Sequence, residues 1–248
     1  MKKFFKWLGI GTGVLLVVVL VTAVVIHEPK PNGTPSAEAD AMARRMMDAV
    51  HAPAWDSTRW VQWTFAGVHR YLWDKQRHWV HVSWDENAVL LDTKTSEGVA
   101  YQNETTVVGK EADDLLQTAE DFFNNDSFWL NAPVKAFDPG TERSLVTLKD
   151  GRSGLMVSYQ SGGTTPGDAY VWLLDEQGRP ESWKMWVSII PIGGVEASWE
   201  NWHELATGTQ LATQHQMGPL TLKVTDVQGA MTWEALGQQE DPFAALAP

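Results

Sequence analysis

The sequence predicts an α+β fold that is mainly β: a curved antiparallel sheet, or half-barrel, covered by two helices and preceded by one transmembrane helix. Three observations lead to this prediction. Many short segments alternate apolar and polar residues, which is the period of a β-strand. Turn clusters such as Asp85-Glu86-Asn87 and Ile192-Gly193-Gly194 separate these segments at the spacing of an antiparallel meander. Only two segments after the N-terminal run have helical periodicity, which is too few for a helix bundle.

The N-terminal run from Trp7 to Ile26 contains no charged residue and follows three lysines. At ~1.5 Å per residue, a helix over this run reaches roughly 30 Å, the thickness of a bilayer core. The apolar region of a cleaved signal peptide is usually only about 7–15 residues long and is followed by a small-x-small site. We therefore predict an uncleaved anchor, with a signal peptide removed near Ala37 or Ala39 as the alternative.

The lysines before this run place the N-terminus in the cytoplasm, by the positive-inside rule. The rest of the chain then lies outside the cytoplasmic membrane. Residues 1–27 form the cytoplasmic end and the anchor, residues 28–35 are a linker rich in proline, and residues 36–248 form one extracytoplasmic domain.

Composition excludes several classes of function. The chain has no cysteine, so a disulfide scaffold, a thiolate metal site and a cysteine nucleophile are ruled out. Its net charge of −12 repels phosphate backbones, and we expect no nucleic-acid partner. The 14 tryptophans fit either a tryptophan-rich core or a tryptophan-lined cavity.

Two helices are predicted in the exported domain. The first is capped by Ser36, has its apolar residues at helical spacing as far as Val50, and is closed by Pro53. The second runs from Glu111 to Asn124, with an acidic first turn that suits the helix dipole. Its apolar stripe consists of Leu115, Leu116, Ala119, Phe122 and Phe123.

The predicted strands carry large side chains on one face. Val61, Trp63 and Phe65 share a face because side chains two residues apart point the same way. The same alternation groups Val80, Val82 and Trp84; Leu155, Val157 and Tyr159; Trp183, Met185 and Val187; and Val195, Ala197 and Trp199.

Several motifs together resemble the LolA/LolB-like lipoprotein-carrier superfamily, and more narrowly uncharacterised bacterial exported proteins predicted to share that fold. They are Trp60, Trp63 and Phe65; Tyr71-Leu72-Trp73-Asp74; Phe128-Trp129-Leu130-Asn131-Ala132-Pro133; Thr165-Pro166-Gly167-Asp168; and Trp199-Glu200-Asn201-Trp202. The resemblance implies a half-barrel whose open side is closed by helices around an apolar cavity. It also implies a bacterial inner-membrane protein with a periplasmic domain. LolA itself is a soluble carrier, whereas this chain is expected to stay tethered.

No catalytic motif is evident. The chain lacks a nucleophile elbow, a phosphate loop and a metalloprotease helix. His78 and His81 are three residues apart, which places them on opposite faces of a strand and makes them a poor metal pair. We therefore expect no enzyme activity, no metal and no cofactor.

The remaining signal is aromatic. We predict that a lipid or other apolar molecule binds against the inner face, with the second helix as a lid. The candidate ligand-binding residues are Trp63, Phe65, Tyr71, Trp73, Phe122, Phe123, Tyr159, Trp183 and Trp199. The alternative is an envelope interaction or assembly protein with a filled core and no ligand, contacting a protein partner through the exposed sheet face or edge. A hydrolase is a third and more remote reading.

Overall fold

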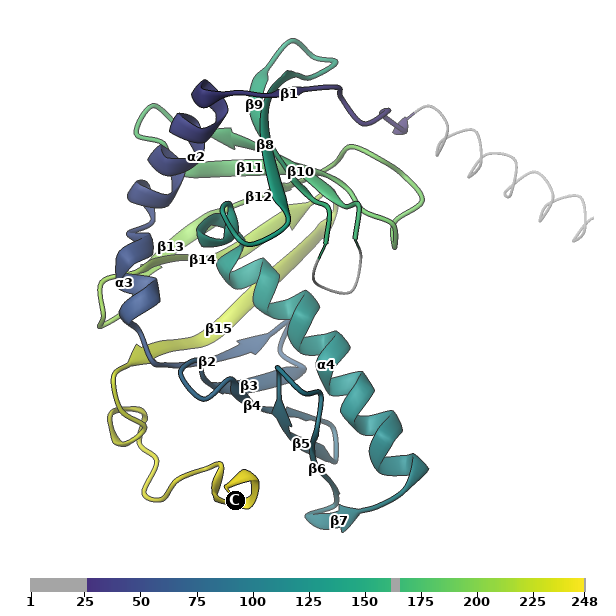
Figure 1. The fold of residues 1–248 in the computed structure, drawn as a ribbon, viewed down its shortest axis with the longest axis vertical. Coiled ribbons are helices and arrows are strands. Elements are labelled where there is room, and N and C mark those ends of the chain that lie inside the picture. The colour runs from purple at the N-terminus through teal and green to yellow at the C-terminus, as the bar shows by residue number, and fades with distance from the viewer. Residues whose placement is uncertain (1–25, 162–165, 248) are drawn as a thin grey trace, which may run out of the picture.

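The computed structural model describes residues 26–161 and 166–247 and is mainly β (Figure 1). Within these residues the strands form two antiparallel sheets, and neither is closed into a barrel. The first has the order β1 (Thr34–Pro35), β8 (Thr141–Thr147), β9 (Ser153–Tyr159), β10 (Ala169–Leu174), β11 (Pro180–Trp186) and β12 (Val195–Ser198).

The second sheet is built around a meander from the first half of the chain. Its order is β13 (Glu200–Glu204), β14 (Gln210–Met217), β15 (Leu220–Ala230), β2 (Trp60–Phe65), β3 (His69–Asp74), β4 (Trp79–Trp84), β5 (Asn87–Asp92), β6 (Gly98–Gln102) and β7 (Thr105–Val107). The pairing of β15 with β2, in which Val224 lies opposite Phe65, joins the C-terminal strands to this meander.

The sequence predicts one curved sheet, and this prediction is wrong, because the described strands form two sheets. The chain leaves the first sheet after Ser198 and enters the second at Glu200, with the buried Trp199 at the step between them. The Ser198 backbone carbonyl lies 2.9 Å from Nδ1 of His215, and its hydroxyl accepts the Gln216 N–H at 2.8 Å. Side-chain alternation indicated the inward face here but not the change of sheet, because alternation carries no information about the strand that will pair.

The first predicted helix is α2 (Ala37–Ala49), and its N-cap is confirmed: the Ser36 hydroxyl accepts the Ala39 N–H at 3.1 Å. Pro53 does not simply close this helix. It lies in the first turn of a second short helix, α3 (Ala52–Ser57), where a missing N–H costs nothing. His51, in a left-handed conformation, separates the two helices.

The second predicted helix is longer than expected. It is α4 (Lys110–Asn131), which continues past Asn124 because no glycine or proline interrupts it before Pro133. In Figure 1, α4 crosses the strands of the second sheet diagonally and reaches the first sheet with its C-terminal end. It therefore packs against both sheets.

Both ends of the described chain pack on the sheets. Residues 28–35, expected as a linker, lie along the first sheet and supply β1. The C-terminal segment after β15 packs on the outer face of the second sheet, where Phe243 joins a cluster with Trp60, Leu72 and Leu90. The sequence analysis did not anticipate this tail.

None of the helices in residues 26–161 and 166–247 combines the length and apolar character needed to cross a membrane. The predicted anchor, Trp7 to Ile26, lies outside the described residues except for Ile26.

Candidate functional site

The inner faces of the two sheets carry two aromatic clusters, which meet at the C-terminal half of α4. We call the first the Trp63 cluster; it contains Trp63, Phe65, Tyr71, Trp73, Phe122 and Phe123. We call the second the Trp183 cluster; it contains Phe128, Tyr159, Tyr170, Trp172, Trp183 and Trp199. All nine candidate residues from the sequence lie in these clusters, six in the first and three in the second. Trp129 of α4 packs against both.

The Trp63 cluster is held by ring contacts between neighbouring strands and the helix. Trp63 and Tyr71 are directly opposed on β2 and β3, and their rings stack with centroids 4.4 Å apart. Phe123 of α4 meets Trp73 edge-on at 5.1 Å. Phe122 also faces the sheet, stacking on His69 at 3.9 Å. The predicted apolar stripe of this helix therefore does cover the inner face of the second sheet.

The Trp183 cluster is centred on one indole. The centroid of the Trp183 ring lies 4.9 Å from that of Trp172 and 5.0 Å from those of Trp199 and Trp129. Trp172 is directly opposite Trp183 across the β10–β11 pair. Trp172, Phe128, Trp129 and Tyr170 were not among the residues predicted for the site, although Phe128 and Trp129 stand in one of the motifs that carry the family resemblance.

These rings fill the space between α4 and the sheets. Trp63 is 1% exposed and Trp183 is 0% exposed. Two open hollows in the described part of the surface lie elsewhere, and none of the nine candidate residues lines either of them. One, of about 530 Å³, lies at the turn around Asp85 and at Tyr101.

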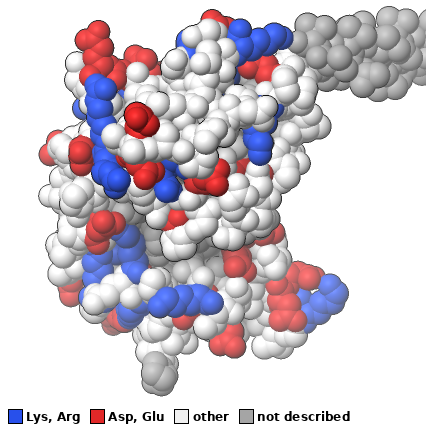
Figure 2. Space-filling view, turned by 45° about the horizontal axis from the view of Figure 1, so that its top comes forward, with Lys and Arg blue, Asp and Glu red and all other residues white. Residues whose placement is uncertain are grey.

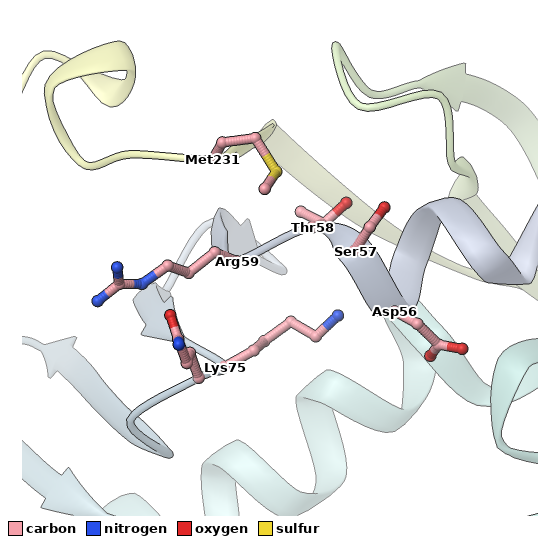
Figure 3. Close-up of a pocket in the computed structure, with 7 residues that line it drawn as sticks. Asp56, Ser57, Thr58, Arg59, Lys75 and Met231 are labelled. Carbon is pink, nitrogen blue, oxygen red and sulfur yellow. The ribbon is translucent and has the colours of Figure 1, made fainter.

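The other hollow, of about 370 Å³, is a surface feature at the end of α3 (Figure 3). Six of the seven residues that line it have polar or charged side chains, and the Lys75 side chain extends across it towards the α3 residues. The Lys75 ammonium lies 4.0 Å from the Trp55 ring centroid, and burial lowers the pKa of Lys75 to about 8. This hollow is therefore unlike the apolar cavity expected from the sequence.

The interior contains hydrogen-bonding groups without a partner among the described residues. In and around the two clusters they are the indole N–H groups of Trp63, Trp73, Trp172, Trp183 and Trp199, the Tyr159 hydroxyl, Oδ1 of Asn131 and Nε2 of His215. The Trp60 indole, which packs with Phe243 on the outer face, and the Thr209 hydroxyl also lack a partner among these residues. A buried polar group left unpaired costs about 1–3 kcal/mol, and proteins contain few of them. Five of the six unpartnered indole N–H groups of the described residues belong to the two aromatic clusters.

A polar contact ties α4 to β3 at the edge of the Trp63 cluster. The carboxylate of Asp126, which is 2% exposed, accepts the Tyr71 hydroxyl at 2.5 Å and lies 2.7 Å from Nδ1 of His69. Burial raises the pKa of Asp126, while hydrogen bonds from Tyr71, His69 and Asn125 act in the opposite direction. Burial and the nearby Asp126 charge raise the pKa of Tyr71. No sequence motif indicated this contact.

Among the described residues, no group of three or more His, Asp or Glu side chains is placed to hold a metal ion. His78 lies in the turn before β4 and His81 lies within that strand. The chemistry that the described interior offers is therefore apolar contact together with hydrogen-bond donors.

Comparison with known proteins gave few matches. No protein-family model matches the chain, and no curated protein matches it. The crystal structure of a DUF1329 family protein from Desulfovibrio piger is similar to it with a TM-score of 0.39 and 9% sequence identity, over 81% of this chain and 100% of the other.

Proposed function

We propose that this protein is a membrane-anchored extracytoplasmic domain of the LolA-like, half-barrel type that binds a lipid or another hydrophobic molecule without catalysing a reaction. The ligand would lie between α4 and the inner faces of the two sheets. The observation that carries the proposal is the set of unpaired donors among the aromatic rings of the interior.

The donors indicate the kind of ligand. A core that evolved only for packing gains nothing from five buried indole N–H groups without acceptors. A ligand with an acyl chain and ester or carboxyl oxygens would cover the rings and accept these N–H groups. Ligand sites commonly combine an apolar lining with a few polar groups of this kind.

Access to this site would require α4 to move. The helix contributes Phe123, Phe128 and Trp129 to the two clusters, so its displacement would uncover both at once. Elements that open for a ligand are drawn from the less stable parts of a fold. We therefore assign α4 the role of a lid.

One observation favours a second candidate, an envelope interaction or assembly protein with a filled core. The aromatic rings pack closely, and the two open hollows at the end of α3 and around Asp85 are not among them. In this case a partner protein would bind the sheet surface and the interior would be structural.

Native mass spectrometry of the full-length protein, released from a mild detergent, tests the proposal. We expect a bound species of discrete mass that organic extraction identifies as a lipid. Trp63→Phe and Trp183→Phe should weaken its retention by about fivefold each, since a neutral hydrogen bond contributes about 1 kcal/mol. The matched control is Trp79→Phe, because the Trp79 indole already donates to Asp92 at 3.1 Å.

A wild-type protein that is folded and carries no lipid would favour the interaction protein instead. The anchor is tested separately. We expect the protein to resist carbonate extraction and to keep Met1, whereas a soluble form beginning near Ala37 or Ala39 would identify a cleaved signal peptide.

A further inference from the structure

The connection between β11 and β12 presents an apolar surface. Residues Ile189, Ile190, Pro191 and Ile192 follow one another there, and Ile189 is 69% exposed. Pro191 is also exposed, whereas Ile190 and Ile192 are half-buried and Ile190 packs against the core of the first sheet. Burying an isoleucine side chain is worth about 1.5–3 kcal/mol, so Ile189 would gain most from an apolar partner. We call residues 188–192 the isoleucine loop.

The N-terminal segment is bonded to the base of this loop. The Gly193 N–H donates to Nδ1 of His27 at 3.0 Å, and the Glu28 N–H donates to the Gly193 carbonyl at 2.9 Å. A Cβ on Gly193 would lie 2.6 Å from the Glu28 carbonyl oxygen, so this close approach requires glycine. The two backbones therefore hold each other in a fixed position.

Side chains reinforce this attachment. The Trp186 indole donates to the Glu28 carbonyl at 2.7 Å. The Lys184 ammonium, whose side chain is 7% exposed, lies 2.8 Å from Oε1 of Glu28. The segment from Glu28 onward thus cannot swing away from the domain without breaking a buried ion pair and several hydrogen bonds.

The position of this attachment matters because the uncharged run ends at Ile26. If that run spans the bilayer, Ile26 lies at the membrane surface, and Gly193 contacts the next two residues. At about 3.8 Å between successive Cα atoms, Glu28 lies at most about 8 Å from Ile26, and the hydrogen-bonded pair adds about 5 Å, so the base of the isoleucine loop lies within about 13 Å of the membrane surface. Apolar groups of interfacial elements reach about 5–10 Å into the headgroup and acyl boundary, so the loop can enter it.

The charge around this contact is mixed. Lys30 is exposed near the same end of the chain, and Figure 2 shows basic and acidic side chains on otherwise uncharged surface next to the N-terminal end of the described residues. A basic side chain near a membrane surface favours anionic headgroups.

We propose that the isoleucine loop inserts into the outer leaflet of the membrane and, with the N-terminal anchor, fixes the orientation of the domain on the bilayer. A single flexible tether would leave the domain free to rotate. Two membrane contacts, joined by the hydrogen bonds between the N-terminal segment and Gly193, would prevent this rotation. The proposal rests on the anchor of the proposed function and is independent of its ligand.

The absence of native cysteine allows a direct test on the full-length protein. Ile189→Cys is labelled with an environment-sensitive fluorophore, and the protein is reconstituted in vesicles of phosphatidylethanolamine and phosphatidylglycerol. The matched control is Val68→Cys, on a turn of the second sheet, where valine is 58% exposed. A third variant, Leu16→Cys, reports on the anchor itself.

We expect the label at 189 to shift to the blue and to lose its emission when lipids with a shallow spin label are included, while the label at 68 stays quenchable by iodide. The label at 16, which the anchor would place near the bilayer centre, is tested with lipids that carry the spin label deep in the acyl chain. Quenching at 16 without quenching at 189 would overturn the loop insertion and leave the anchor in place. A label at 189 that is shielded from both quenchers would also overturn it, since a protein surface would then cover the loop. No lipid quenching at either 16 or 189 would overturn the anchor together with the loop.

Discussion

The hydroxyl of Tyr71 donates a 2.5 Å hydrogen bond to Oδ2 of Asp126 and so joins strand β3 to helix α4. The same carboxylate lies beside His69, at the start of that strand. A carboxylate at this depth loses most of its hydration, and these partners replace only part of it. The contact therefore holds the proposed lid with a group whose charge state depends on pH.

We predict that Asp126 contributes more to the stability of the folded protein as the pH falls from neutral towards 4. Burial raises the folded-state pKa of Asp126 above its ordinary value of 3.8, so the folded protein binds the proton more tightly than the unfolded chain. The resulting contribution to stability is complete below the unfolded pKa and is lost as the pH rises through the raised folded pKa. Urea unfolding at a series of pH values measures it, with Asp126→Asn as the reference.

The difference in unfolding free energy between the wild type and Asp126→Asn should thus grow in favour of the wild type on acidification. The trend should persist in a His69→Gln background, because burial is the largest cause of the raised pKa of Asp126. A difference that is constant between pH 7 and 4 would show that Asp126 does not titrate in this range.

We predict that α4 exchanges its amide hydrogens faster than the strands that carry Trp63 and Trp183. A lid must open by local unfolding or displacement at a lower free energy than the strands beneath it. Phe122→Ala/Phe123→Ala removes two rings that contact the sheet and should speed the exchange further. An acyl-chain ligand should slow it. Hydrogen exchange with mass spectrometry checks this, and exchange in α4 as slow as in β2 and β11 would make the helix a permanent part of the core.

The C-terminal tail should be a major source of stability for the second sheet. Phe243 is completely buried, and its ring stacks on Trp60 with centroids 5.8 Å apart. Arg77 connects the same tail to the sheet by pairing with Asp241 and with the buried Asp74. Phe243→Ala should cost about 3–5 kcal/mol of unfolding free energy, the usual cost of such a truncation.

Denaturant titration measures this cost, and Met231→Ala provides the control, because Met231 is exposed in the same tail. A loss for Phe243→Ala no larger than that of the control would mean that the tail is only loosely attached.

The attachment of the N-terminal segment should depend on the pairing between Glu28 and Lys184. Glu28→Gln removes the charged acceptor and leaves the Lys184 ammonium with Asp150, 3.8 Å away, and with Glu196 opposite it on β12 as acidic neighbours. Hydrogen bonds to charged groups contribute about 1.5–3 kcal/mol, so residues 28–35 should become more accessible to proteases. Adding Lys184→Met should restore part of the protection, because the unpaired charge is gone. Equal cleavage of the wild type and Glu28→Gln would contradict this assignment.

The sequence by itself determined the mainly β, antiparallel character of the fold, the first helix and its cap, and the inward face of the main strands. It did so because these properties are local. Alternation at Val61, Trp63 and Phe65, or at Trp183 and Met185, records which side of a strand avoids water, and these residues are buried as expected. Ser36 caps a helix through its own neighbours.

Only the tertiary structure decided how the aromatic residues are grouped and what holds α4. Backbone hydrogen bonds are offered equally by nearly every residue, so the sequence does not specify that β15 pairs with β2 or that the sheet changes at Trp199. Asp126 lies beyond the predicted end of the second helix, and its role is visible only once the fold places it beside Tyr71. Glu28 belongs to the predicted linker until it meets Lys184. Contacts between residues far apart in the chain become visible only when the packing brings them together.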